Sequence, residues 1–204
     1  MSQVAAGPGR PRLVEQRRRG ATARDEILDA AAELFTTRGY SGTSTRMIAE
    51  AVGIRQASLY HHFKTKDDIL ESLLQDTVLA PLEHAVDLID AEGSALDRLL
   101  TLARFDAGQL AGSRWNLGAL YLLPELRTDR FAEFRSARSD LARIYARLAG
   151  EVLGDQSDAR RHLPFRLVES VISMRSDEMV GVLGSDSLDE LVTALVDSIE
   201  LILA

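Results

Sequence analysis

Polar side chains that can hydrogen-bond to nucleic-acid bases are grouped at residues 56–58. The carboxamide of Gln56 has the geometry to pair with two atoms of adenine, and the hydroxyl of Ser58 can bond a base or a phosphate. Ala57, between them, can contact a thymine methyl group. These residue types, adjacent at the start of a predicted helix, indicate chemistry suited to contacting DNA bases.

The predicted helix over residues 54–63 divides its side chains between two faces. Leu59 and Phe63 lie on one face, near Gln56, and can anchor the helix in a core. The opposite face carries Ala57, Tyr60 and His61. We expect this second face to meet the major groove, with the N-terminal tip nearest the base edges and with Tyr60 and His61 against the backbone.

Two preceding helices are expected to position this one. Thr22 and Asp25 form a capping pattern that opens a helix ending at Gly39. Ser44 can cap a short second helix, and Gly53 supplies the turn out of it. Two short helices joined by a glycine turn, with a polar second helix and a basic flank, are typical of a helix-turn-helix.

Three segments of this region resemble the DNA-binding signature of the TetR family of transcriptional regulators. They are AAELFTTRGY at residues 31–40, IAEAVG at 48–53 and LYHHFKTK at 59–66, in the family's order and spacing. The resemblance covers about the first third of the chain, and one departure is Arg55, where the family often has a small capping residue. It implies an all-α homodimer, with a three-helix helix-turn-helix DNA-binding domain followed by a helical ligand-binding and dimerisation domain.

The resemblance also implies further contacts to DNA. Arg46 matches the family position that enters the groove, where its planar fork suits guanine, and Ser44 and Thr45 are placed for phosphate. Lys64 and Lys66 are the only lysines in the chain, and they match the start of the helix that follows the family's helix-turn-helix, where the family usually grips a phosphate with a lysine. The alternative for these lysines is an ordinary solvated charge pair.

The chain is acidic overall, with a formal net charge of −7, but the charges are divided along its length. Residues 1–66 hold 11 basic and 6 acidic residues, whereas the remainder carries a net charge of −12. We expect residues 1–20 to form a flexible basic arm. The arginines that could enter a minor groove are Arg10, Arg12 and Arg17 to Arg19. A solvated tail without DNA contacts is the alternative.

Several other functions find no support in the sequence. The chain has no cysteine, which excludes disulfides and thiolate metal sites. No P-loop, Rossmann glycine pattern, GxSxG or HExxH motif occurs, and the histidines lack partners at metal-binding spacing, so we expect no cofactor, no metal and no catalysis. No apolar segment suits a signal peptide or a membrane span, so the bacterial cytoplasm is the expected location. The alternative function is an all-helical enzyme or interaction module that carries a non-regulatory helix-turn-helix.

The predicted domains are the arm at 1–20, the helix-turn-helix at 21–66 and an effector-binding and dimerisation domain at 67–204. Thr65 and Asp68 form a capping box for a long helix that Pro81 should kink or end. Beyond it, five segments have helical spacing: Ser94–Leu110, Trp115–Leu123, Thr128–Leu153, Pro164–Leu183 and Ser187–Ala204.

By the family resemblance, a small effector should bind a cavity between the helices of the second domain. Bulky apolar residues with a few polar groups line most such sites. The candidates here are Phe105, Trp115, Asn116, Tyr121 and Met174, each of which could instead be plain core. These candidates favour a hydrophobic or aromatic effector, and the acidic excess of this half weakly disfavours a highly anionic one.

The last helix is apolar enough to serve as a subunit interface. Its apolar positions at helical spacing, which we expect at the interface, are Leu188, Leu191, Val192, Leu195, Ile199 and Ile202. Packing within the subunit is the alternative, and periodicity does not distinguish the two. By resemblance, Pro164–Leu183 and Ser187–Ala204 should form a four-helix bundle with the same helices of a second copy. The two recognition helices of such a dimer would bind a near-palindromic operator.

Overall fold

The computed structural model describes residues 19–181 and 187–204, and these residues form helices without a strand. The α-helices are α1 (Ala23–Arg38), α2 (Thr45–Val52), α3 (Gln56–His62), α4 (Lys66–Ile89), α5 (Ala95–Gly112), α6 (Ala132–Leu153), α7 (Leu163–Met179) and α8 (Leu188–Leu203). Short 3-10 helices lie between some of them: η1 (Leu117–Leu122), η2 (Pro124–Arg127), η3 (Asp129–Phe131) and η4 (Ala159–His162). The expected all-α fold is confirmed. Most of the predicted basic arm, up to residue 18, lies outside the described residues.

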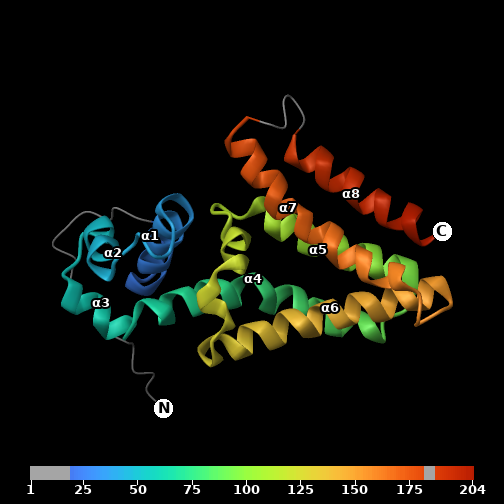
Figure 1. Ribbon diagram of the computed structural model, residues 1–204, viewed down its shortest axis with the longest axis horizontal. Coiled ribbons are helices and arrows are strands. Elements are labelled where there is room, and N and C mark those ends of the chain that lie inside the picture. Colours follow the sequence, from blue (N-terminus) through green and yellow to red (C-terminus); the bar gives the residue numbers. More distant parts are fainter. Residues whose placement is uncertain (1–18, 182–186) are drawn as a thin grey trace, which may run out of the picture.

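The helices divide into a small head and a longer body that α4 joins (Figure 1). The head consists of α1, α2 and α3, and the body consists of α5 to α8 with the 3-10 helices. Within the body, α4 packs against α5 and α6, while α7 and α8 pack on α5. No helix in the described ranges is long and apolar enough to cross a membrane.

Side-chain caps begin the helices where the sequence predicts them. Thr22 and Thr65 each form a complete capping box, with Asp25 and Asp68 respectively. The Ser44 hydroxyl accepts a hydrogen bond from the Met47 amide at the start of α2. Because each cap satisfies an amide that has no partner within its helix, it fixes the helix start. Gly53 then ends α2 in the left-handed region, at φ 81°.

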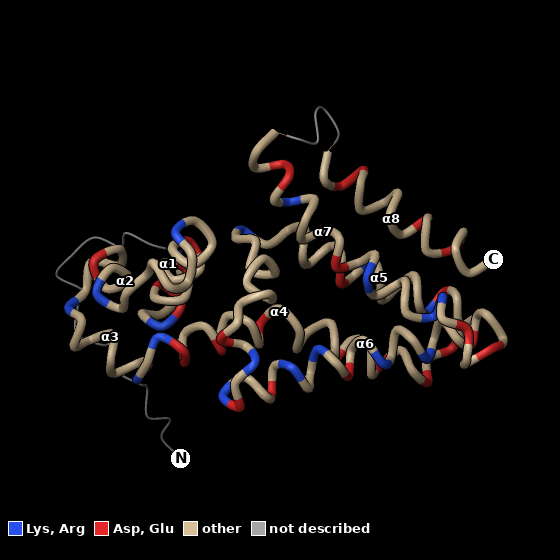
Figure 2. Tube along the Cα trace, viewed as in Figure 1, with Lys and Arg blue, Asp and Glu red and all other residues tan. Residues whose placement is uncertain are grey.

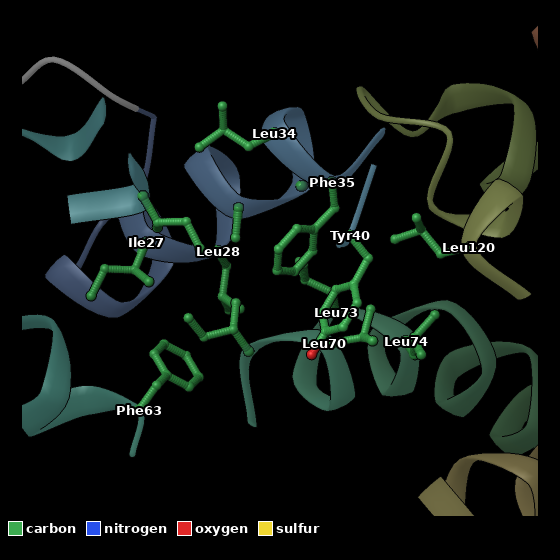
Figure 3. Close-up of a cluster of buried hydrophobic side chains, with 14 of the residues drawn as sticks. Ile27, Leu28, Leu34, Phe35, Tyr40, Phe63, Leu70, Leu73, Leu74 and Leu120 are labelled. Carbon is green, nitrogen blue, oxygen red and sulfur yellow. The ribbon is translucent and has the colours of Figure 1, made fainter. Parts of the chain in front are cut away.

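A first hydrophobic core holds the head together and extends well beyond it (Figure 3). It contains the buried anchors of the short helices, Ile48 from α2 and Leu59 from α3, which are both fully buried. It also takes the first half of α4 as far as Val78. Residues from distant sequence complete it: Leu120, Leu126, Phe131 and Phe134. The head is therefore packed onto part of the body rather than being separated from it by a linker.

A second core occupies the interior of the body. It is built from α4 beyond Pro81 together with α5, α6, α7 and α8. Tyr145 and Phe165 meet at its centre, with ring centroids 5.5 Å apart. Since α4 contributes to both cores, a displacement of α4 in the body also changes how α4 packs against the head.

The structure excludes one of the two effects predicted for Pro81, a kink or the end of the helix. The prediction allowed Pro81 to end this helix, but α4 continues to Ile89. Proline removes one backbone donor and crowds the preceding turn. Pro81 is buried, however, and Ala85 and Leu88 beyond it pack into the second core. Because burial of these apolar residues compensates for the missing hydrogen bond, the helix continues past Pro81.

Other helices also differ from the sequence prediction, and the one predicted from Thr128 begins as α6 at Ala132, after η3. The third helix begins at Gln56 instead of Ile54, and its N-cap Arg55 makes no side-chain capping bond. The predicted Trp115–Leu123 helix is the 3-10 helix η1, which passes so close to α7 that a Cβ on Gly118 would lie 2.5 Å from the Ile172 side chain. α7 ends at Met179, and the predicted end at Leu183 lies outside the described residues.

Candidate nucleic-acid interface and adjoining cavity

The helix α3 presents its polar side chains outward and its anchors inward. Leu59 is fully buried and Phe63 is 4% exposed. The predicted base- and backbone-contacting residues are all exposed: Gln56, Ala57, Ser58, Tyr60 and His61. Tyr60 is 45% exposed, so most of this face is open to solvent. The exposed face of α3 is thus a surface of hydrogen-bonding groups on a rigidly anchored helix.

A polar cluster ties the recognition face to the start of α2. The Gln56 side-chain amide donates to the Thr45 hydroxyl at 3.0 Å and to the Tyr60 hydroxyl at 3.3 Å. The hydroxyls of Thr45 and Tyr60 are themselves 3.1 Å apart. The cluster therefore holds three of the predicted DNA-contacting side chains in one arrangement before any DNA is bound. Sequence reasoning predicted each residue as a DNA contact but missed their mutual bonds, two of which join Thr45 of α2 to α3.

Arg46 lies on the outer face of α2. Its guanidinium pairs with Glu50 one turn later at 2.9 Å, and the two side chains are 77% and 63% exposed. Water screens such a pair strongly, so the pair holds Arg46 only weakly. Arg46 is free to exchange Glu50 for a phosphate or a guanine edge. Ser44, beside it, is exposed and caps α2.

The two lysines occupy different environments. Lys64 is exposed, whereas the Lys66 ammonium donates to the carbonyls of Tyr40 at 2.8 Å and Thr43 at 3.0 Å. It also lies 3.9 Å from the centre of the Tyr40 ring, and the Tyr40 hydroxyl donates to Asp67. Burial and the hydrogen bond to Asp67 raise the pKa of Tyr40 above its usual range. Lys66 thus clamps the α1–α2 loop to α4, with at most one ammonium proton left for a phosphate.

We expect replacement of each lysine by alanine to have a different effect. Lys66→Ala should lower the free energy of unfolding by about 1–3 kcal/mol, because two buried carbonyls lose a charged donor. Lys64→Ala should leave stability unchanged within about 0.5 kcal/mol. It should reduce by about one the slope of the logarithm of the DNA-binding constant against the logarithm of the salt concentration. Urea unfolding and binding titrations at several salt concentrations measure both. Equal stability of the two variants would contradict a stabilising role for the bonds from Lys66 to the Tyr40 and Thr43 carbonyls.

A cavity of about 350 Å³ opens at the junction of η1, η2, α6 and α7. Its apolar wall comes from Tyr121, Leu122, Leu123, Leu126, Phe134, Ala142 and Phe165. Its polar wall includes four arginines: Arg127, Arg135, Arg138 and Arg166. This volume is within the usual range for small-molecule sites.

Of the five residues predicted to line an effector site, Tyr121 lines this cavity and the other four do not. Phe105 is 36% exposed and stacks on His84, with ring centroids 4.5 Å apart. Asn116 is buried and donates to the Ile172 carbonyl at 2.9 Å. Trp115 packs against the first core and Met174 against the second. The arginines were missed because nothing in their sequence spacing indicates that they converge.

A buried acid lies behind the cavity. Asp106, 4% exposed, accepts a hydrogen bond from the Tyr145 hydroxyl at 3.1 Å. A small internal space in front of it is also lined by Tyr121, Arg138 and Glu169. Burial raises the pKa of Asp106 to about 7, since a charged carboxylate is poorly solvated there, and the nearby Glu169 adds to the shift.

Residues 114–131, called here the linking segment, touch both the cavity and the head. At one end, Arg114 pairs with Asp29 of α1 at 2.8 Å, and the Trp115 indole donates to the same carboxylate at 3.1 Å. At the other end, Arg130 bonds Glu71 of α4 at 2.7 Å. Between these ends, Tyr121 walls the cavity. The segment thus joins the cavity to the head by direct contacts.

The residues predicted for a subunit interface divide into two groups. Leu195 and Ile199 are 5% and 0% exposed in the single subunit, where they belong to the second core. The others are half-buried: Leu188, Leu191, Val192 and Ile202. The outer face of α8 presents different residues, including Thr193, Ala194 and Asp197. Acidic residues but no basic ones lie along α8 in Figure 2.

Comparison with known proteins identifies the class to which this helix-turn-helix belongs. The chain matches the family described as "Bacterial regulatory proteins, tetR family" over residues 27–73. The HTH-type transcriptional repressor KstR2 of Mycolicibacterium smegmatis is 39% identical over 89 residues. That alignment spans 43% of this chain and 43% of the relative, which is less than half of either length.

Solved structures extend the similarity to the body. The crystal structure of Mycobacterium smegmatis AmtR is 53% identical, covers 91% of this chain and 98% of its own, and superposes with a TM-score of 0.76. AibR, solved in complex with isovaleryl coenzyme A and operator DNA, has a TM-score of 0.69 at 17% identity, covering 86% of this chain and 96% of its own, and so shows the fold alone. The chain belongs to the TetR family of bacterial regulatory proteins. None of these three relatives is named as an enzyme.

Proposed function

We propose that this protein is a sequence-specific DNA-binding transcriptional regulator, a repressor that leaves a near-palindromic operator when a small effector binds. The exposed polar face of α3 carries the proposal, because its side chains are held outward by buried anchors and by the bonds among Thr45, Gln56 and Tyr60. A relative named as a transcriptional repressor shares this part of the chain.

The proposed DNA contacts follow from these positions. Gln56, Ala57 and Ser58 would contact base edges, and Tyr60 and His61 the backbone. On the flanks, Arg46 would enter the groove. Phosphate contacts would come from Ser44, Thr45 and Lys64, with a smaller part for Lys66, whose ammonium already binds two carbonyls.

The effector is proposed to act through the linking segment and α4. Tyr121 forms part of the cavity wall, and its hydroxyl donates to Thr77 of α4 at 2.7 Å. A ligand in the cavity therefore contacts a residue bonded to the helix that carries the head. Release of DNA requires that the ligand bind more tightly to the protein when the two heads of a dimer have a spacing that does not fit the operator. AibR, which shares this fold, has been solved in complex with isovaleryl coenzyme A and operator DNA.

The proposed assembly is a homodimer formed by the outer faces of α7 and α8, because a two-fold operator needs two related recognition helices. Leu195 and Ile199 support α8 from inside the subunit, so a charge there would unfold the body instead of testing the interface.

The informative substitution for the dimer is Ala194→Glu, on the exposed face of α8. We expect it to shift the protein from dimer to monomer, because an added carboxylate would be buried beside Asp197 and its copy in the partner. Sedimentation velocity, with circular dichroism to verify folding, measures this effect. A folded variant that stays dimeric at the wild-type concentration range would contradict the assignment of α8.

Selection of bound DNA from a random duplex library tests the proposed function. The wild type should enrich a near-palindrome, and the Gln56→Ala, Tyr60→Ala double variant should lose it while retaining salt-sensitive general binding. The double variant changes only exposed side chains, so its fold should be intact. Failure of the wild type to enrich any sequence at low or moderate salt would reject the proposal.

A further inference from the structure

The walls of the 350 Å³ cavity combine one sign of charge with an apolar surface. Four guanidinium groups line it, and no carboxylate is among the residues that form its walls. Tyr121, Phe134 and Phe165 provide aromatic surface in the same space. Arg135 already donates to the Leu126 and Thr128 carbonyls. A neutral hydrophobic ligand would use the aromatic part of this wall but would offer no acceptor to the guanidinium N–H groups that remain unbonded. The composition instead fits a ligand with an anionic end and an apolar body.

The arginines are held in place with hydrogen-bonding capacity to spare. Arg138 stacks over Tyr121 and over Phe165, at 5.4 and 5.5 Å from the ring centroids, and Arg166 lies 5.3 Å from the Phe165 centroid. Stacking fixes the plane of a guanidinium and leaves its N–H edge available. Arg127, at the cavity wall, is exposed and bonds no other residue in the described part of the chain.

One carboxylate of the protein already accepts hydrogen bonds from two of these arginines. Glu169 of α7 accepts from Arg138 Nε at 2.8 Å and from Arg166 at 2.6 Å. Within the described ranges, it is the one carboxylate that bonds any of the four cavity arginines. Glu169 lies toward the small space in front of Asp106, behind the main cavity. It therefore serves as an internal counter-ion for two arginines that also line the cavity.

We propose that the cavity binds a small organic anion, whose carboxylate or phosphate group is held by Arg127, Arg138 and Arg166 and whose apolar body lies on Tyr121 and Phe165. The ligand's anion competes with Glu169 for the same guanidinium groups. This inference rests on the proposed function and names the chemical class of its effector. It differs from the expectation of a hydrophobic or aromatic effector, which took into account the acidic excess of the whole body but not the four arginines of the cavity wall.

Four probes with one eight-carbon tail separate the head-group chemistries: octanoate, octyl phosphate, octylamine and octanol. Calorimetric titration of the full chain without DNA should show octanoate or octyl phosphate binding roughly tenfold or more tighter than octanol, with octylamine weakest. The stronger of the two anions identifies the head group. Octanol or octylamine binding as tightly as both anions, or no binding of either anion at millimolar concentration, would overturn the proposal.

Three variants test the residues assigned. The double change Arg127→Gln, Arg166→Gln should weaken the preferred anion roughly tenfold, whereas Arg104→Gln, a matched change at an exposed arginine of α5 outside the cavity, should not. Glu169→Gln should tighten it severalfold, since it removes the competing carboxylate, and misfolding does not produce such a gain. Unchanged anion affinity in the double variant, or weaker binding in Glu169→Gln, would overturn the assignment.

The calorimetry is independent of DNA, so the two proposals fail separately. Intact operator selection without anion binding would remove only the effector class. Anion binding without any enriched DNA sequence would remove the regulatory function and leave a ligand-binding protein.

Discussion

Leu120→Ala is expected to lower the free energy of unfolding by about 2–4 kcal/mol, because a buried leucine leaves a cavity that its neighbours do not fill completely. Leu120 belongs to η1, more than fifty residues beyond the start of α4, yet it is 4% exposed and extends into the core of the head (Figure 3). Its loss should also weaken operator binding, since the head would be less firmly packed on α4. Chemical denaturation and a DNA titration measure the two effects.

The matched control for this change lies two residues away. Leu122 is 91% exposed and lines the cavity, so Leu122→Ala should change stability by less than about 0.5 kcal/mol. Because the two variants carry the same substitution in the same 3-10 helix, their difference in stability measures the contribution of packing against the head, apart from contact with the cavity. Equal destabilisation by the two changes would show that the linking segment does not share the core of the head.

Asp106→Asn is expected to stabilise the protein at pH 8 by roughly 2 to 4 kcal/mol and to have little effect near pH 4. Burial raises the pKa of Asp106 to about 7 from an ordinary value of 3.8. In the wild type, the favourable contribution of a neutral Asp106 is complete below pH 4 and declines as the pH rises through 7. Asparagine stays neutral throughout and retains an acceptor for the Tyr145 hydroxyl.

The charged and hydrogen-bonding groups around Asp106 contribute to this pH dependence. Tyr145 donates to it, and Glu169 and Arg138 line the same internal space. Thermal or urea unfolding between pH 4 and pH 8 measures the difference between variant and wild type. Asp87→Asn, at an exposed position of α4, controls for the loss of one negative charge. A difference that is constant across this pH range would contradict a buried, titrating Asp106.

Local sequence signals predicted the head well, because its structure depends on neighbouring residues. The capping boxes at Thr22 and Thr65, the glycine turn at Gly53 and the buried anchors Leu59 and Phe63 all occur where predicted. Each depends on residues within about one helical turn. The exposure of α3's polar face follows from the same periodicity.

The cavity and the linking segment could not be predicted in this way. Arg127 and Arg166 are far apart in sequence and meet only because η2 and α7 pack around the same space. Lys66 shows the same limitation at a single residue, since its position suggested a phosphate contact, while its two carbonyl partners lie more than twenty residues earlier. Contacts of this kind depend on the packing of whole elements, which helical spacing does not encode.

The most direct test of the account is the base preference of a Gln56→Ala variant on the selected operator, measured by competition with operators changed one base pair at a time. We expect the variant to lose discrimination at one symmetric pair of positions, by about 1–3 kcal/mol, and to keep wild-type preferences elsewhere. Unchanged preference at every position, or a uniform loss of affinity across all sequences, would contradict base recognition by α3.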